Sequence, residues 1–167
     1  MPAIPSYAGY DGLGRNLASH GMVVVSIGAN GINANDGFLD DGGASARAQL
    51  ILEHLRRWRT WDADAGASPF GARFVGHIDL DRVGLMGHSR GGEGIAAAVQ
   101  LNQRSSVRFG IRAAFTDKSG PSGVVQFRKL IAHWFAPRKC IHEAHEETRK
   151  KADSLCVFVY FADRIFL

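Results

Sequence analysis

The sequence predicts an α/β fold built on a mostly parallel sheet, and three observations support this prediction. Residues 22–27 are continuously apolar and rich in β-branched side chains, which is typical of a strand buried on both faces of a parallel sheet. Residues 44–58 carry apolar side chains at helical spacing. A second short apolar run then leads through a glycine-rich turn into a further helix. Such strand–helix alternation indicates parallel strands joined by right-handed crossovers.

The composition is that of a single globular domain spanning residues 1–167. A hydrophobic content of 46% and a charged content of 22% are ordinary for a chain that buries a core. The net charge of +4 is mild, and no lysine or arginine run is interleaved with aromatics, so no nucleic-acid partner is expected. The two cysteines do not make a disulfide framework. Because neither a membrane-spanning run nor a signal peptide is visible, the localisation is unknown and taken as cytoplasmic by default.

The first predicted elements lie before residue 44. Residues 10–20 are expected to form a short helix, because Leu13 and Leu17 lie four apart on one face and Gly21 is suited to end it. After the first strand, residues 28–43 are rich in glycine, asparagine and aspartate. We expect a loop there, at the carboxyl end of the strand, where open α/β sheets place their ligand sites.

The helix at residues 44–58 is the clearest element of the pattern. Its apolar stripe consists of Ala48, Ile51, Leu52 and Leu55, with Asp40 and Asp41 near its start and Arg56, Arg57 and Arg59 at its end. The remaining predicted elements are a surface connection (60–76), the strand and helix around the glycine-rich turn (to about residue 103), a strand (111–115), a turn-rich break (116–123), two helices (124–135 and 141–153) and a buried strand (155–161).

The glycine-rich turn is the most informative motif. Gly87-His88-Ser89-Arg90-Gly91 has the G-x-S-x-G pattern between a strand and a helix, where the turn strains the serine backbone and projects its hydroxyl above the sheet edge. Glycine is favoured at both ends of the pattern because a Cβ would collide where the strand and the helix approach each other. The helix behind Ser89 points its N-terminus at this site, so the backbone N–H of Arg90 is suited to stabilise an oxyanion. The alternative is a glycine-rich turn with an incidental serine.

Several stretches around this motif carry a family resemblance. The chain resembles α/β-hydrolases of the acetylhydrolase, chlorophyllase and dienelactone-hydrolase group in four stretches. Three of them are residues 10–27, residues 30–33 and the helix at 47–55. The fourth and most specific is Ile78-Asp79-Leu80-Asp81-Arg82-Val83-Gly84-Leu85-Met86-Gly87-His88-Ser89-Arg90-Gly91-Gly92. The resemblance covers about residues 10–115. It implies a partial α/β-hydrolase fold, three-layer α/β/α with a mostly parallel sheet. It also implies a nucleophile at Ser89 and a small-molecule ester substrate.

The chain also departs from that family. The family has further strands and an oxyanion loop before the helix at 10–20, where this chain has nine residues. After residue 115 the resemblance stops, and residues 116–167 lack the family's closing acid-then-histidine loops. We therefore expect a truncated member, or one whose last third has a different origin, for example through a frameshift. Because lost strands would leave unpaired sheet edges, we also expect the chain to self-associate.

A serine nucleophile needs a base and a carboxylate, and the sequence leaves both unassigned. One candidate acid is Asp117, just past a strand end, with turn capping as its alternative role. The other is Asp163, which follows a strand that topologically resembles the one that carries the acid in the family. No histidine follows Asp163, although in this fold the base comes after the acid.

The candidate bases lie in the last third of the chain. They are His133, His142 and His145. Each also has a plain structural role as its alternative: His133 fits the face of a helix, and His142 and His145 fit a solvated helix face rich in charged residues. His88 belongs to the turn itself. We expect it to line the pocket, because adjacent residues on a tight turn point in different directions.

Metal and nucleotide sites are not expected. Cys140-Ile141-His142-Glu143-Ala144-His145 contains ligand types, but its histidines lie three apart rather than four, and no second Cys/His cluster exists. Ser26-Ile27-Gly28-Ala29-Asn30-Gly31 lacks the G-x-G-x-x-G spacing, and no phosphate-binding G-x-x-x-x-G-K-[ST] motif occurs. The sequence therefore predicts no cofactor.

The leading hypothesis is a serine hydrolase-like domain that acts on carboxylic esters. Ser89 would attack the acyl carbon, the Arg90 N–H would stabilise the oxyanion, and residues 28–43 would line the pocket. The alternative is a non-catalytic fragment or pseudo-enzyme that keeps this architecture without a complete triad. The motif favours the first hypothesis, whereas the unassigned histidine and the missing oxyanion strand favour the second.

Overall fold

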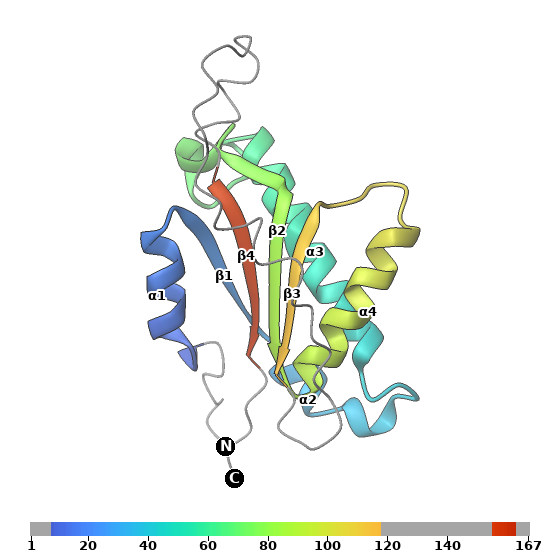
Figure 1. Ribbon diagram of the computed structural model, residues 1–167. Helices are drawn as coiled ribbons and strands as arrows, with labels where there is room; N and C mark the ends of the chain where they lie inside the picture. The colour runs from blue at the N-terminus through green and yellow to red at the C-terminus, as the bar shows by residue number, and fades with distance from the viewer. Residues whose placement is uncertain (1–7, 118–154, 163–167) are drawn as a thin grey trace.

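The computed structural model describes residues 8–116 and the backbone of Asp117 and of residues 155–162 (Figure 1). In chain order, the elements are α1 (Asp11–Ser19), β1 (Met22–Gly28), α2 (Asn30–Asn33), η2 (Asp36–Phe38), α3 (Ala44–Ala63), η3 (Gly71–Phe74), β2 (Ile78–His88), α4 (Arg90–Arg104), β3 (Ile111–Asp117) and β4 (Leu155–Ala162). Helices and strands alternate as far as β3, so the protein is of the mixed α/β class predicted from the sequence. No helix in the described ranges is long and apolar enough to cross a membrane.

The sheet has the strand order β1-β4-β2-β3, and every neighbouring pair is parallel. Although β4 comes last in the chain, it lies in the middle of the sheet, between β1 and β2 (Figure 1). Its register pairs Phe158 with Val24 on one side and with Gly84 on the other. The sequence predicted this strand but not its neighbours. A central position satisfies the backbone hydrogen-bonding groups of β4 along both of its sides.

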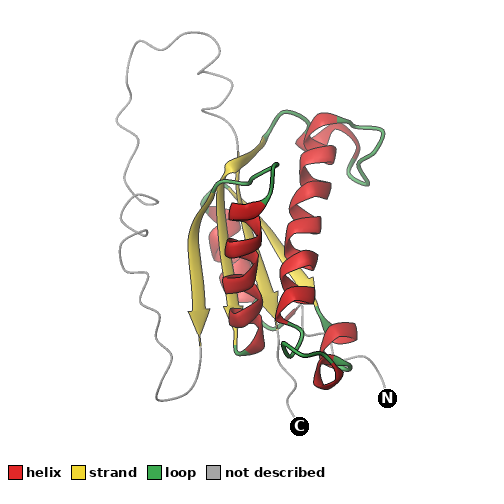
Figure 2. Cartoon of the chain, turned by 90° about the vertical axis from the view of Figure 1, so that its right-hand side faces the viewer, coloured by secondary structure: helices red, strands yellow, loops and turns green. Residues whose placement is uncertain are grey.

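The hydrophobic core lies between the sheet and helices α3 and α4, which cover one of its faces (Figure 2). Alternate side chains of the strands point into it, as the pleat of a strand requires. Its most deeply buried members are Ile27 of β1, Val83 and Leu85 of β2, Ala48, Ile51, Leu52 and Leu55 of α3, and Ile95 and Ala98 of α4. The intervening side chains form a smaller cluster with α1 on the other face, made of Tyr10, Leu17, Met22, Val24 and Met86.

Helix α3 is longer than the sequence predicted. It was expected to end at Trp58 but continues to Ala63. The additional turn carries Trp61, whose ring packs edge-on against Trp58 at 5.1 Å between centroids, and Phe70 stacks on Trp58 at 5.7 Å. These aromatic contacts stabilise the extra turn. The three arginines expected at the end of the helix consequently lie in its interior.

Residues 28–43, predicted as a loop, contain the short helix α2 and the turn η2. The chain then reverses into α3 through Gly42 and Gly43, whose φ angles of 59° and 80° are left-handed and suit glycine. Asp41 caps the new helix, because its carboxylate accepts hydrogen bonds from the backbone N–H groups of Gly43 at 3.0 Å and Ser45 at 2.7 Å. As predicted, this segment follows the carboxyl end of β1.

Candidate functional site

Ser89 lies at the sharp turn between β2 and α4, in residues 87–91, which we call the Ser89 turn. Its backbone has φ 54° and ψ −123°. Among the described residues it is the only non-glycine residue with a positive φ. Such a conformation costs an L-amino acid on the order of 1–3 kcal/mol, so the surrounding structure must hold it in place. The strained serine that the G-x-S-x-G pattern predicted is therefore confirmed.

Two glycines let the strands and α4 come close enough for this turn. A Cβ on Gly87 would lie 2.6 Å from the carbonyl carbon and oxygen of Gly91 and 2.8 Å from Ile95 Cδ1. A Cβ on Gly92 would lie 3.1 Å from the Cβ of Thr116 on β3. A larger residue at Gly87 would push α4 away from β2 and release the Ser89 turn.

The N-terminus of α4 adjoins Ser89. The helix begins at Arg90, and the backbone N–H of Gly92 donates to the carbonyl oxygen of Ser89 at 2.9 Å. The N–H groups of a first helical turn and the helix dipole both favour negative charge at this end. The arrangement is therefore suited to stabilise an oxyanion that forms on a substrate at Ser89.

Three charged side chains, which we call the Asp36 cluster, connect the start of α4 with η2 and α3 through hydrogen bonds and ion pairs. Asp36 lies in η2 after β1, Arg47 in α3, and Arg90 at the first position of α4. Asp36 Oδ2 accepts hydrogen bonds from Arg47 Nη2 at 2.6 Å and from Arg90 Nη1. One carboxylate oxygen thus joins two arginines from different helices.

Arg47 is the buried anchor of the Asp36 cluster, with a side chain that is 0% exposed. Its Nη1 donates to the carbonyl oxygen of Gly42 and its Nη2 to Asn33 Oδ1, both at 2.7 Å. The aliphatic part of the side chain packs against Gly94 of α4, where a Cβ would lie 2.6 Å from the Arg47 Cβ. A charge so deeply buried is tolerated only when it is paired and hydrogen-bonded. The Asp36 carboxylate therefore stabilises the buried charge of Arg47, together with Gly42 O and Asn33 Oδ1.

The two arginines keep Asp36 ionised. The hydrogen bond from Arg47 lowers the pKa of Asp36 the most, and the positive charge of Arg90 lowers it further, whereas partial burial acts in the opposite direction. The net result is a pKa below the ordinary value of 3.8. Asp36 is consequently an anion at neutral pH and is not suited to exchange a proton with a substrate.

One of the two candidate acids has its backbone beside the Ser89 turn. Asp117 ends β3, and its Cα is the register partner of His88, the residue before Ser89; its side chain lies outside the described part of the protein. Asp163 lies outside the described residues, one position beyond the end of β4. Also outside them are the predicted helices and their candidate bases, His133, His142 and His145.

The described side chains include a candidate nucleophile, Ser89, beside a helix N-terminus suited to an oxyanion, but no candidate base in contact with Ser89. Among the described side chains, those of residues 8–116, none is hydrogen-bonded to Ser89 Oγ. His88 Nδ1 is buried and has no hydrogen-bond partner in the same range. Nor does this part of the chain hold a group of three His, Cys, Asp or Glu side chains that could bind a metal.

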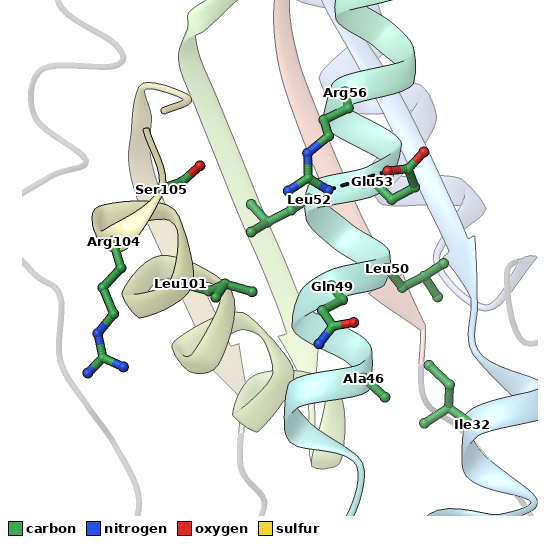
Figure 3. Close-up of a pocket in the computed structure, with 10 residues that line it drawn as sticks. All are labelled: Ile32, Ala46, Gln49, Leu50, Leu52, Glu53, Arg56, Leu101, Arg104 and Ser105. Atoms are coloured by element: carbon green, nitrogen blue, oxygen red, sulfur yellow. Dashed lines mark hydrogen bonds and ion pairs between the residues drawn. The ribbon is translucent and has the colours of Figure 1, made fainter. Parts of the chain in front are cut away.

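A groove with a volume of about 730 Å³ lies between α3 and α4 (Figure 3). Leu52 and Leu101 enter it from the two helices, and Arg56 donates to Glu53 at 3.3 Å along one side. Its lining residues are Ile32, Ala46, Gln49, Leu50, Leu52, Glu53, Arg56, Leu101, Arg104 and Ser105. None of them belongs to the Ser89 turn or to the Asp36 cluster, so this groove is separate from the candidate nucleophile.

Neither Asp36 nor Arg47 was predicted from the sequence as part of the site. Arg47 lies four residues before Ile51, on the apolar stripe of α3, so an arginine at a core position was the available signal. Asp36 offered no such signal, because it is one of three aspartates between residues 36 and 41, and nothing local distinguishes them.

Comparisons of the chain with protein-family models, with curated proteins and with solved structures found no match.

Proposed function

We propose that this chain is a serine hydrolase-like protein that acts on carboxylic esters, with Ser89 as the nucleophile. The observation that supports this most strongly is the strained, positive-φ backbone of Ser89, with φ 54°, between a parallel strand and a helix. A side chain kept at such a position, where glycine would be less strained, indicates that the hydroxyl is needed there. An incidental serine in a glycine-rich turn would be expected to have an ordinary conformation.

The proposed reaction uses the two features that meet at the Ser89 turn. Ser89 Oγ attacks the acyl carbon of the ester while a base takes its proton, and the backbone N–H of Arg90 stabilises the resulting oxyanion. The base then protonates the leaving alcohol. Water attacks the acyl-enzyme in the same way, which releases the carboxylic acid and restores Ser89.

We further propose that the fold is a partial form of the three-layer α/β-hydrolase fold. The parallel sheet, the helices α3 and α4 on one face and the packing of α1 against β1 on the other support this assignment. The position of Ser89 after β2, a strand with a parallel neighbour on each side, supports it too. Asp117 is the favoured acid because the β3 register puts its backbone beside His88. Asp163 is the other candidate acid, and the base is to be sought among His133, His142 and His145.

A non-catalytic scaffold is the second candidate function, and one observation favours it. No side chain within residues 8–116 is hydrogen-bonded to Ser89 Oγ, so the described side chains include no base in contact with the proposed nucleophile. In this alternative, the Ser89 turn is retained architecture and the chain does not turn over an ester.

Labelling of the purified protein by a fluorophosphonate probe distinguishes the two functions. We expect the wild-type protein to be labelled and both the Ser89→Ala variant and heat-denatured protein to remain unlabelled. Ser105→Ala is a matched control, because it removes a hydroxyl that donates to Val107 O just past the far end of α4 and should leave labelling unchanged. A protein that is folded by circular dichroism but is not labelled at Ser89 would favour the scaffold. Hydrolysis of nitrophenyl esters of graded acyl length would then define the acyl preference of a protein that is labelled.

A further inference from the structure

The Ser89 turn is linked through Arg90 to Asp36, a residue far away in the sequence. Asp36 and Arg90 are separated by 54 positions, yet their side chains form an ion pair. The Asp36 side chain is 12% exposed and that of Arg90 is 36% exposed, so the pair is partly shielded from water. Partial shielding strengthens such a pair relative to one on an open surface.

The Asp36 carboxylate, which pairs with Arg90, is itself fixed in position by the buried Arg47. Arg47 donates to the same oxygen of Asp36, and Arg47 is in turn bonded to Gly42 O and Asn33 Oδ1 and packed against Gly94. A continuous series of contacts therefore runs from the core face of α3 through Asp36 to the first residue of α4. Any displacement of Asp36 would disturb a fully buried arginine, which makes its position rigid.

We propose that Asp36 is a positioning residue for the Ser89 turn. By holding the Arg90 side chain against the buried Arg47, it keeps the Ser89 backbone and the Arg90 N–H in one orientation. This inference rests on the proposed function, in which that N–H stabilises the oxyanion. The close approach of Gly87 and Gly91 sets the distance between β2 and α4, and Asp36 fixes the start of α4 from a third element.

Asp36 acts through Arg90 and is not a catalytic residue. Within the described residues its carboxylate is hydrogen-bonded to Arg47 and Arg90 and not to Ser89. An ion pair with a purely structural role would alter the stability of the fold and leave the reactivity of Ser89 unchanged in the molecules that remain folded. A positioning role predicts a loss of reactivity in folded protein.

A second carboxylate–arginine pair provides a matched control. Asp79 Oδ2 accepts from Arg82 Nε at 2.6 Å, and the two side chains are 13% and 37% exposed, nearly the same as in the Asp36–Arg90 pair. This pair lies in the first half of β2, away from the Ser89 turn. Asp79→Asn therefore removes a comparable charge without touching the start of α4.

The test compares Asp36→Asn, Arg90→Ala, the double variant and Asp79→Asn by the rate constant for fluorophosphonate labelling of the full chain. Asparagine at position 36 keeps an oxygen that can accept from Arg47, and Arg90→Ala leaves the Asp36–Arg47 pair in place, so both variants retain the buried anchor. We expect each single variant of the Asp36–Arg90 pair to be labelled roughly tenfold more slowly than wild type. We expect the labelling rate constant of the double variant to be no lower than that of whichever single variant is slower. We expect the rate constant of Asp79→Asn to stay within about twofold of wild type. The proposal would be overturned if the decreases in labelling rate of the two single variants multiplied in the double variant. It would also be overturned if Asp79→Asn were labelled as slowly as Asp36→Asn.

Hydrogen exchange separates a failure of this proposal from a failure of the proposed function. If folded wild-type protein is not labelled, the proposed hydrolase function is wrong, and the exchange rates of the backbone amides of residues 90–92 decide the positioning role. Faster exchange in Asp36→Asn than in both wild type and Asp79→Asn supports it. Equal rates in all three proteins would show that Asp36 does not hold the turn.

Discussion

Gly94 of α4 lies so close to Arg47 of α3 that a Cβ on Gly94 would stand 2.6 Å from the Arg47 Cβ. Cβ atoms do not approach other atoms that closely, so the two helices pack as they do because residue 94 is a glycine. Arg47 is also the anchor of the Asp36 cluster. The packing of α4 on α3 and the position of the Ser89 turn therefore depend on one contact.

We accordingly expect Gly94→Ala to lower the free energy of unfolding by about 1–3 kcal/mol, because Arg47 or the whole of α4 must shift to admit the methyl group. Urea denaturation of the two proteins measures the difference. Gly12→Ala in α1 is the matched control, since no atom lies within 4 Å of its added Cβ. The control should be more stable than wild type by about 0.5–1 kcal/mol, because alanine is the better helix former. A Gly94→Ala protein as stable as wild type would mean that α3 and α4 are not closely packed at this point.

The stability that Asp36 provides should be lost in acid. Arg47 and Arg90 lower the pKa of Asp36 in the folded protein below the value of 3.8 that it has when exposed. A carboxylate whose pKa is lower in the folded state contributes stability above its unfolded pKa and loses that contribution as the pH falls through the folded pKa. The difference in unfolding free energy between wild type and Asp36→Asn should thus be constant from about pH 7 to about pH 5 and shrink below about pH 4.

Urea denaturation at a series of pH values measures this difference. Asp41 also has a lowered pKa, through its hydrogen bonds with Ser45, but it is present in both proteins and its effect cancels. A difference between the two proteins that stays constant down to about pH 2 would show that the Asp36 ion pairs do not stabilise the fold.

The elements predicted best from the sequence are those defined by local patterns. The periodicity of α1 and α3, the apolar runs of β1 and β4 and the G-x-S-x-G turn all appear in the structure close to where they were expected. Ser89 has the strained backbone that its pattern predicted, because the glycines that permit the turn lie within a few residues of it in the sequence.

Relationships between distant segments were not predictable in this way. Nothing local indicates that β4 pairs with both β1 and β2, because both pairings join residues far apart in the chain. The contact of Asp36 with Arg90 is likewise set by the way η2 and α4 meet at the end of the sheet. The extension of α3 to Ala63 depends on packing of Trp61 with aromatic partners, which overrides the local pattern.

The central position of β4 makes the C-terminal part of the chain essential to the fold. A variant that ends at residue 154 would lack the strand between β1 and β2 and leave the facing edges of both without partners. We expect it to lose cooperative urea unfolding and to form oligomers in analytical ultracentrifugation. A variant that ends at residue 162 keeps β4 and is the matched control, which should unfold cooperatively. Cooperative unfolding of the shorter variant would show that β1 and β2 do not need β4.

We expect the strained backbone of Ser89 to lower the free energy of unfolding of the protein. Its φ of 54° is costly for any residue with a Cβ, so Ser89→Ala removes the proposed nucleophile but keeps the strain. Ser89→Gly removes both, and we expect its free energy of unfolding to exceed that of Ser89→Ala by about 1–2 kcal/mol, even though glycine loses more backbone entropy on folding. Urea denaturation of the two variants measures this difference, and neither should react with a fluorophosphonate. If Ser89→Gly were no more stable than Ser89→Ala, the backbone at this position would not be strained, and the strongest support for a nucleophile there would be lost.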